Sequence, residues 1–253
     1  MDELVVDDAD GVRTITINRP EVKNALTAAM RARFCALIEE SDRDESVRAV
    51  IVTAVDPVFS AGVDFKEVAA GGGSRSPASP TTNPGSALRG ATTPVVCAVN
   101  GACVTGALEL ALSCTFIVAS ERARFADTHA RLDVVAAWGL TALLPRAVGV
   151  RKAAELSITG NFVGAEEALR IGLVNHVVAH DELLPFAHAL VDDIAPTAAV
   201  GQVLDLYRRG DGLPLADALA LEAEHAAGRR VDPVAFGAAG AAAAARPSRS
   251  KGE

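Results

Sequence analysis

PVVCAVNGACVTGALELALSC, residues 94–114, is the stretch on which the interpretation of this chain depends. It begins as an apolar β-branched run, passes through Asn100-Gly101 and becomes rich in Leu and Ala from Gly106, which predicts a strand, a tight loop and a helix. The first N–H groups of a helix have no partner within the helix and lie at the positive end of its dipole. Because Gly106 has no Cβ, a ligand oxygen can approach these donors closely.

Glu109 is the only charged side chain between Arg89 and Glu121. A carboxylate buried without a partner is costly, so its place in an apolar helix needs an explanation. One interpretation is a functional carboxylate, and the other is a residue on a solvated stripe of the helix. Composition alone leaves both open.

A second glycine turn, FSAGVDF at residues 59–65, follows the apolar strand expected at residues 49–53. It also leads through a glycine toward a helix. Two such turns, each presenting a backbone N–H, are what an oxyanion hole for a carbonyl requires.

Together with further motifs, these residues resemble the crotonase family, also called the enoyl-CoA hydratase/isomerase family. The motifs follow in order over residues 3–235: Asn18-Arg19-Pro20, Asn24-Ala25-Leu26, residues 59–64, Asn100-Gly101 with Gly106 and Glu109, Phe125-Ala126-Asp127, and ALRIGLVNHVV at residues 168–178. The resemblance implies an α/β fold with a crotonase-type ββα spiral core that binds acyl-CoA in residues 1–180. A helical oligomerisation region at 181–237 and a disordered tail at 238–253 are expected to follow.

The resemblance also implies the site. Backbone N–H groups of Val63 and Gly106 would hold the thioester oxygen, and Glu109 matches the first of two catalytic glutamates in family hydratases. His129 stands where the second glutamate is expected. This histidine can take over proton transfer, mark a different reaction or only hydrogen-bond within its loop. Asp127 and Asp133 are reserve candidates for a second acid or base.

Coenzyme A, as part of the substrate, would meet Lys23, Ala25, Asp64, Phe65 and Lys66, with the two lysines near phosphates. Trp138 either lines the acyl pocket or packs in the core. No separate cofactor and no metal are expected. His176 and His180 have a spacing that can bind a metal, but they lie where a strand is expected to enter a loop.

Composition limits the class of protein. The chain has 253 residues, a net charge of −8 and a pI near 5.2, which argues against a nucleic-acid partner. Four cysteines in apolar surroundings without paired spacing indicate a reduced, cytoplasmic protein. The N-terminus lacks signal-peptide features, and no apolar run approaches the roughly 20 residues of a membrane span.

Local patterns predict further elements. Residues 4–6 and 12–17 form a hairpin, and Thr27 caps a helix whose apolar face includes Met30, Phe34, Leu37 and Ile38. Residues 71–86 are rich in Gly, Ser and Pro, which predicts a mobile loop that overhangs the site or links domains. Helices are expected at 181–193, 197–209 and 214–227, and the resemblance implies that they pack in homotrimers or hexamers.

The predicted function is hydration of a trans-2-enoyl-CoA thioester through an enolate held in the oxyanion hole. An isomerase, hydrolase or decarboxylase on an acyl-CoA would use the same hole. A non-catalytic acyl-CoA-binding scaffold would keep the two N–H donors without a working acid/base pair.

Overall fold

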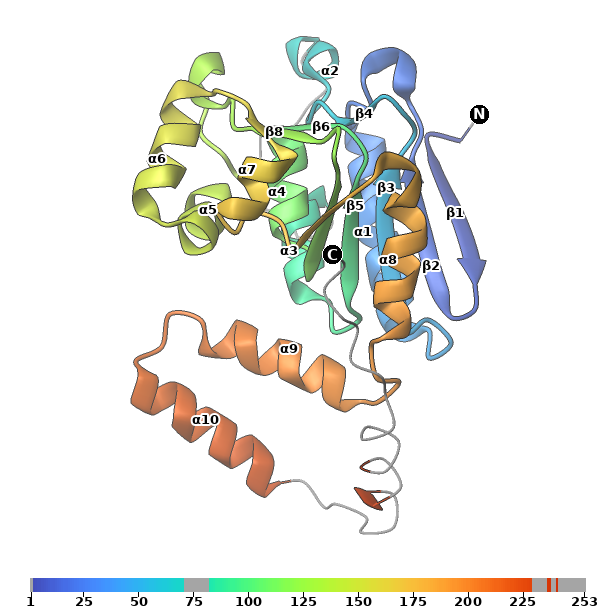
Figure 1. The fold of residues 1–253 in the computed structure, drawn as a ribbon, viewed down its shortest axis with the longest axis vertical. Coiled ribbons are helices and arrows are strands. Elements are labelled where there is room, and N and C mark those ends of the chain that lie inside the picture. Colours follow the sequence, from blue (N-terminus) through green and yellow to red (C-terminus); the bar gives the residue numbers. More distant parts are fainter. Residues whose placement is uncertain (1, 71–81, 229–235, 238–239, 241–253) are drawn as a thin grey trace. The chain divides into compact units, whose positions relative to one another are not determined.

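A computed structural model describes residues 2–70, 82–228, 236–237 and 240. The chain divides into two compact units, Met1–Leu204 and Asp205–Glu253. Among the described residues, every strand belongs to the first unit (Figure 1). The predicted oligomerisation role of residues 181–237 stays a prediction, and almost all of the predicted tail lies outside the described residues.

The main sheet has six strands in the order β1-β2-β3-β5-β7-β10. Their bounds are Leu4–Ala9 (β1), Val12–Ile17 (β2), Ala49–Ala54 (β3), Val95–Val99 (β5), Phe116–Ser120 (β7) and His176–Val178 (β10). β1 and β2 pair antiparallel, with Leu4 opposite Ile17, which confirms the predicted hairpin. The other pairs are parallel.

A second sheet of four short strands has the order β4-β6-β8-β9. Its strands are Val58–Ser60 (β4), Ala102–Val104 (β6), Arg124–Ala126 (β8) and Val163–Gly164 (β9). β3 and β5 of the main sheet each lead into a strand of this sheet and then a helix, which confirms the predicted ββα repeat. One detail of the prediction was wrong: the segment expected to be a tight loop before Gly106 contains β6, which pairs with β4 and β8.

Helices cover both faces of the main sheet (Figure 1). On one face packs α1 (Ala28–Arg43), and Thr27 caps it by accepting a hydrogen bond from the Met30 N–H at 3.2 Å. The predicted apolar residues of α1 are all buried in the larger hydrophobic core. On the other face packs α8 (Leu183–Asp192), which buries Leu183, Ala187 and Val191 against the strands.

The remaining helices surround this framework or follow it. They are η1 (Pro20–Val22), α2 (Phe65–Ala69), α3 (Pro84–Gly90), α4 (Gly106–Leu112), η3 (Ala130–Leu132), α5 (Leu140–Val148), α6 (Val150–Thr159), α7 (Ala165–Arg170), η4 (His180–Glu182), α9 (Ala199–Gly210) and α10 (Leu215–Ala227). The helices predicted after residue 181 are confirmed as α8, α9 and α10. No helix within the described ranges combines the length and the apolar character needed to cross a bilayer.

The loop predicted at residues 71–86 overlaps the described residues only from Thr82 onward. Residues 71–81 lie outside the described residues. Residues 84–86 belong to α3, so the predicted loop was too long at its C-terminal end. The Asn83 side chain accepts a hydrogen bond from the Ser86 N–H at 3.1 Å and Pro84 begins the helix, so the polar composition of this end is that of a capped helix start.

Candidate active site

The two glycine turns lie against one another. Gly62 has a φ of +87°, and a Cβ at this position would lie 2.9 Å from the Gly106 nitrogen. Leu26 forms a parallel bridge with Val63: the Leu26 N–H donates to Gly62 O at 2.8 Å, and the Asp64 N–H donates to Leu26 O at 3.0 Å. Within the described part of the chain, the N–H groups of Val63 and Gly106 donate to no protein acceptor. Both donors are therefore available to a ligand oxygen.

Glu109, in the first turn of α4, has a buried carboxylate held by main-chain donors. The residue is 2% exposed, so it does not lie on a solvated stripe. Its Oε1 accepts hydrogen bonds from the N–H of Trp138 at 2.6 Å and of Leu140 at 3.3 Å. Its Oε2 lies 3.4 Å from Nε2 of His129. The backbone after η3 thus fixes one carboxylate oxygen and leaves the other facing an imidazole.

His129 is held between two carboxylates. Its Nδ1 lies 2.6 Å from Oδ1 of Asp127, which also accepts the His129 backbone N–H at 3.1 Å. Burial opposes the imidazolium, but the hydrogen bonds with Asp127 and Glu109 outweigh burial and raise the pKa of His129 to about 9. Burial likewise opposes the Asp127 carboxylate, yet hydrogen bonds from His129 and Ser157 lower its pKa below the usual range. At neutral pH, His129 is therefore a cation.

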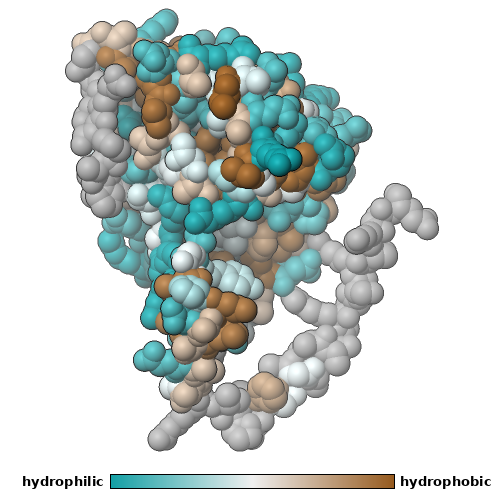
Figure 2. All heavy atoms as spheres, turned by 90° about the vertical axis from the view of Figure 1, so that its left-hand side faces the viewer, coloured by the Kyte–Doolittle hydropathy of each residue, from teal (hydrophilic) through white to brown (hydrophobic). Residues whose placement is uncertain are grey.

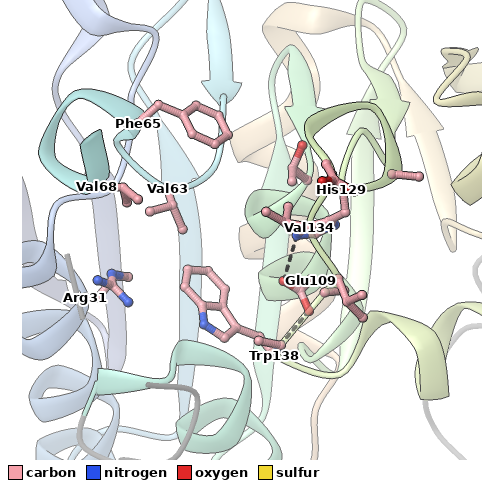
Figure 3. Close-up of a pocket in the computed structure, with 14 residues that line it drawn as sticks. Arg31, Val63, Phe65, Val68, Glu109, His129, Val134 and Trp138 are labelled. Carbon is pink, nitrogen blue, oxygen red and sulfur yellow. Dashed lines mark hydrogen bonds and ion pairs between the residues drawn. The ribbon is translucent and has the colours of Figure 1, made fainter. Parts of the chain in front are cut away.

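A cavity of about 780 Å³ opens onto these groups (Figure 3). Its lining comes from two parts of the chain: Arg31, Val63, Phe65 and Val68 on one side, and Thr105, Glu109 and residues 129–130 and 133–138 on the other. Trp138 is 6% exposed and belongs both to this wall and to the hydrophobic core. Its ring covers Gly106, because a Cβ on that glycine would lie 3.1 Å from Cζ3 of the indole. The cavity is large enough for a small acyl group.

A family model described as enoyl-CoA hydratase/isomerase matches residues 7–227. The chain belongs to this family.

Relatives agree with this assignment. A protein of Arabidopsis thaliana named "Probable enoyl-CoA hydratase 1, peroxisomal" is 37% identical over 223 residues, which cover 87% of this chain and 83% of the relative. A "Probable enoyl-CoA hydratase" of Rhizobium meliloti is 34% identical over 87% of this chain and 86% of its own length.

Solved structures carry the same fold. An enoyl-CoA hydratase from Mycobacterium smegmatis is 44% identical, with a TM-score of 0.75 over 89% of this chain and 96% of that chain. An enoyl-CoA hydratase subunit from Geobacillus kaustophilus has a TM-score of 0.81 at 31% identity, over 88% of this chain and 87% of that one. The predicted crotonase-type α/β fold is confirmed.

In this member of the enoyl-CoA hydratase/isomerase family, the residues predicted to meet coenzyme A come from two adjacent segments. The Ala61 N–H donates to Lys23 O at 3.0 Å, which ties the segment of Lys23 and Ala25 to the turn before Val63. The side chains of Lys23, Phe65 and Lys66 are exposed. The Asp64 carboxylate is engaged within the protein, since it pairs with Arg19 at 3.0 Å and caps α2.

The other candidates occupy different places. Asp133 lines the cavity, whereas Asp127 contacts His129. The two histidines considered for a metal point to different partners. His180 bridges Ser120 at 3.0 Å and Asp56 at 2.9 Å, and the ring of His176 lies 5.0 Å from that of Phe186.

Two features of this site were not predicted from the sequence. Arg31, on α1, is buried in the cavity wall, although the sequence places it beside the apolar face of the helix. The hydroxyl groups of Thr105 and Thr128 lie 2.5 Å apart and join the turn before Gly106 to the loop of His129. Thr105 has a φ of +58°, which is rare for a β-branched residue. No pattern in the sequence predicts this conformation.

Proposed function

We propose that this protein adds water to the double bond of trans-2-enoyl-CoA thioesters. The observation that carries the proposal is the buried Glu109 carboxylate, which faces His129 in a cavity bordered by the turns of Val63 and Gly106. A base and an acid in a cavity, together with two unpaired N–H donors on the turns that border it, are the groups that addition across a conjugated thioester needs.

In the proposed reaction the thioester oxygen accepts hydrogen bonds from the N–H groups of Val63 and Gly106. Glu109 removes a proton from water as the water oxygen bonds to the β-carbon, and the π electrons move onto the thioester oxygen to form an enolate. Donors fixed in advance stabilise this developing charge, and one such donor contributes about 3 kcal/mol in other enzymes.

His129 completes the proton balance in this scheme. As an imidazolium it gives a proton to the α-carbon of the enolate, which restores the neutral thioester. The proton held on Glu109 then passes to the neutral imidazole across the 3.4 Å between Oε2 and Nε2, so both groups regain their starting states. Asp127 holds Nδ1 and thereby orients Nε2 toward Glu109.

Coenzyme A is proposed to bind along the segments of Lys23, Ala25, Phe65 and Lys66, where exposed lysines can meet its phosphates. No cofactor besides the substrate is required by this chemistry. The four cysteines are free thiols, as suits the proposed cytoplasmic location.

Assembly into a homotrimer, or into a hexamer of two trimers, is a further part of the proposal. Large apolar side chains are exposed around α6, among them Val150, Ile158 and Phe162. Figure 2 shows hydrophobic residues at the surface on this side of the first unit. Exposed apolar area of this kind marks surfaces that contact other proteins. Analytical ultracentrifugation at several protein concentrations measures the number of subunits in the assembly.

The loss of the conjugated enone absorbance of crotonyl-CoA tests the reaction. Wild type is expected to consume the substrate, and Glu109→Gln and His129→Ala are each expected to slow it by about 100-fold or more. The exposed Glu121→Gln serves as a control for the loss of one carboxylate and is expected to match wild type.

The same assay separates the alternatives. If wild type does not hydrate crotonyl-CoA but isomerises, hydrolyses or decarboxylates another acyl-CoA, the oxyanion hole serves that other reaction. Acyl-CoA binding without turnover of any thioester would favour a scaffold. A Glu109→Gln variant as fast as wild type would contradict the mechanism.

A further inference from the structure

Arg31 is a buried cation in the wall of the cavity. It is 8% exposed, whereas Arg33 on the same helix reaches solvent and pairs with Glu40 at 2.6 Å. Across the described residues, no ion pair or hydrogen bond involves the Arg31 guanidinium, and its buried Nε has no partner. Burying a charge without a counter-ion is costly, so this arrangement opposes stability unless a ligand completes it.

The surroundings of Arg31 offset this cost only in part. The guanidinium carbon lies 5.7 Å from the centre of the Trp138 ring, within range of a cation–π contact. That contact leaves the N–H donors unmatched. Figure 3 shows the guanidinium on the side of the indole where Val63 and Val68 lie, and all four residues line the cavity that an acyl chain would fill.

The two sides of the cavity differ in charge. Glu109 lies beyond the indole from Arg31 in Figure 3, and Asp133 also borders the cavity. Asp127 and Glu109 flank the single positive charge of His129, so that group carries a net negative charge. An anionic end of an acyl chain would be repelled there and attracted to Arg31.

We propose that Arg31 binds a carboxylate at the distal end of the acyl chain, so that the preferred substrate is the mono-CoA thioester of an unsaturated dicarboxylic acid. The planar guanidinium can hold both oxygens of a carboxylate. The phosphates of coenzyme A are poor candidates for this place, because Arg31 is enclosed while Lys23 and Lys66 offer charges at the surface. This inference rests on the proposed hydration of enoyl-CoA, whose substrate class it specifies.

A matched pair of substrates tests the inference. Trans-2-hexenedioyl-CoA and trans-2-hexenoyl-CoA share chain length and double bond and differ only in a terminal carboxylate or methyl group. Wild type is expected to show a kcat/KM about 10- to 100-fold higher for the dicarboxylic substrate, the range of a charged hydrogen-bonded pair. Arg31→Met, which retains side-chain bulk without charge, is expected to abolish this preference, and the exposed Arg33→Met is expected to retain it.

Binding separates a failure of this inference from a failure of the hydratase proposal. The saturated thioesters adipoyl-CoA and hexanoyl-CoA cannot be hydrated, so calorimetric titration with them reports recognition alone. Tighter binding of adipoyl-CoA to wild type but not to Arg31→Met supports the anion site even if neither enoyl-CoA is turned over. The anion site at Arg31 is refuted if wild type binds the two thioesters with equal affinity. It is also refuted if Arg31→Met loses affinity for both thioesters to the same extent.

Discussion

The hydroxyl of Thr105 lies 2.5 Å from the hydroxyl of Thr128, so the turn that presents the Gly106 N–H is bound to the loop that carries His129. Thr105 is buried. The two halves of the proposed site, the anion hole and the acid/base pair, therefore share one side-chain hydrogen bond.

Replacing one threonine of this pair should cost more than replacing both. Thr128→Val leaves the buried hydroxyl of Thr105 without its partner, which is expected to lower the free energy of unfolding by about 1–3 kcal/mol. Thr105→Val/Thr128→Val removes both hydroxyls and should recover much of the loss. Urea denaturation of the two single variants and the double variant measures the coupling energy, and strictly additive effects would contradict the shared bond.

The contact between the two glycine turns predicts a sharp loss of activity on adding one methyl group. In Gly62→Ala the new Cβ would lie 2.9 Å from the Gly106 nitrogen and 3.0 Å from Val104 O, at a φ of +87°. The turns must separate, and kcat for hydration is expected to fall by about 100- to 1,000-fold, as on loss of an oxyanion donor.

Gly149→Ala is the matched control for that change. Gly149 also has a positive φ, +79°, but a Cβ there meets nothing within 4 Å. It should lose about 1–3 kcal/mol of stability from the backbone alone, because its ψ of 151° lies in a region almost restricted to glycine, and keep wild-type kcat. Equal kinetic losses in the two variants would show that strain, not the approach of the turns, is responsible.

The charge on His129 predicts an alkaline limit to activity. Its pKa of about 9 means that the imidazolium persists through neutral pH and disappears as pH rises through about 9. If this cation delivers the proton to the α-carbon, kcat/KM should fall tenfold per pH unit above that value. A pH–rate profile of crotonyl-CoA hydration checks this, with His129→Gln expected to be slow and to lack the alkaline limb.

The same group links stability to pH. The folded-state pKa lies above that of an unfolded histidine, so its contribution is fully present below pH 6.5 and lost as pH rises through about 9. A rise from 6.5 to about 9 corresponds to on the order of 3 kcal/mol. Denaturation midpoints between pH 6 and 10 should therefore fall more steeply in wild type than in His129→Gln, and parallel curves would refute the ion-pair assignment.

Trp138 supplies an intrinsic reporter of ligand binding. It is the only tryptophan of the chain and forms part of the cavity wall. Binding of a non-hydratable acyl-CoA should change the fluorescence of the indole as water leaves the cavity. Trp138→Phe should abolish the signal, and calorimetry on that variant should still detect binding. An unchanged spectrum at saturating ligand would place the acyl group elsewhere.

The features of this fold that depend on neighbours along the chain are predictable from the sequence. The hairpin of β1 and β2, the Thr27 cap and the glycine turns each have a local residue pattern that is typical of one backbone geometry. The sequence around Glu109 is compatible with either a buried or a solvated carboxylate, because the partners that hold it, the N–H groups of Trp138 and Leu140, are distant in sequence.

Features that arise from contacts between distant segments were not predictable in this way. Arg31 follows Met30 on a helix and would be expected in solvent, but it is buried beside the indole of Trp138 in the wall of the cavity. The three residues of β6 form a strand only because β4 and β8 lie on either side. The β-strand propensity of individual residues carries little information about such short strands.

The attachment of Glu109 Oε1 to main-chain N–H groups has a consequence for engineering. Peptide donors at positions 138 and 140 persist whatever side chains occupy the neighbouring wall, unless proline is introduced. Residues 134–137 can therefore be randomised to reshape the acyl compartment while the carboxylate keeps its anchor. A library confined to those four positions would vary which acyl groups are accepted while the Glu109 carboxylate stays in place.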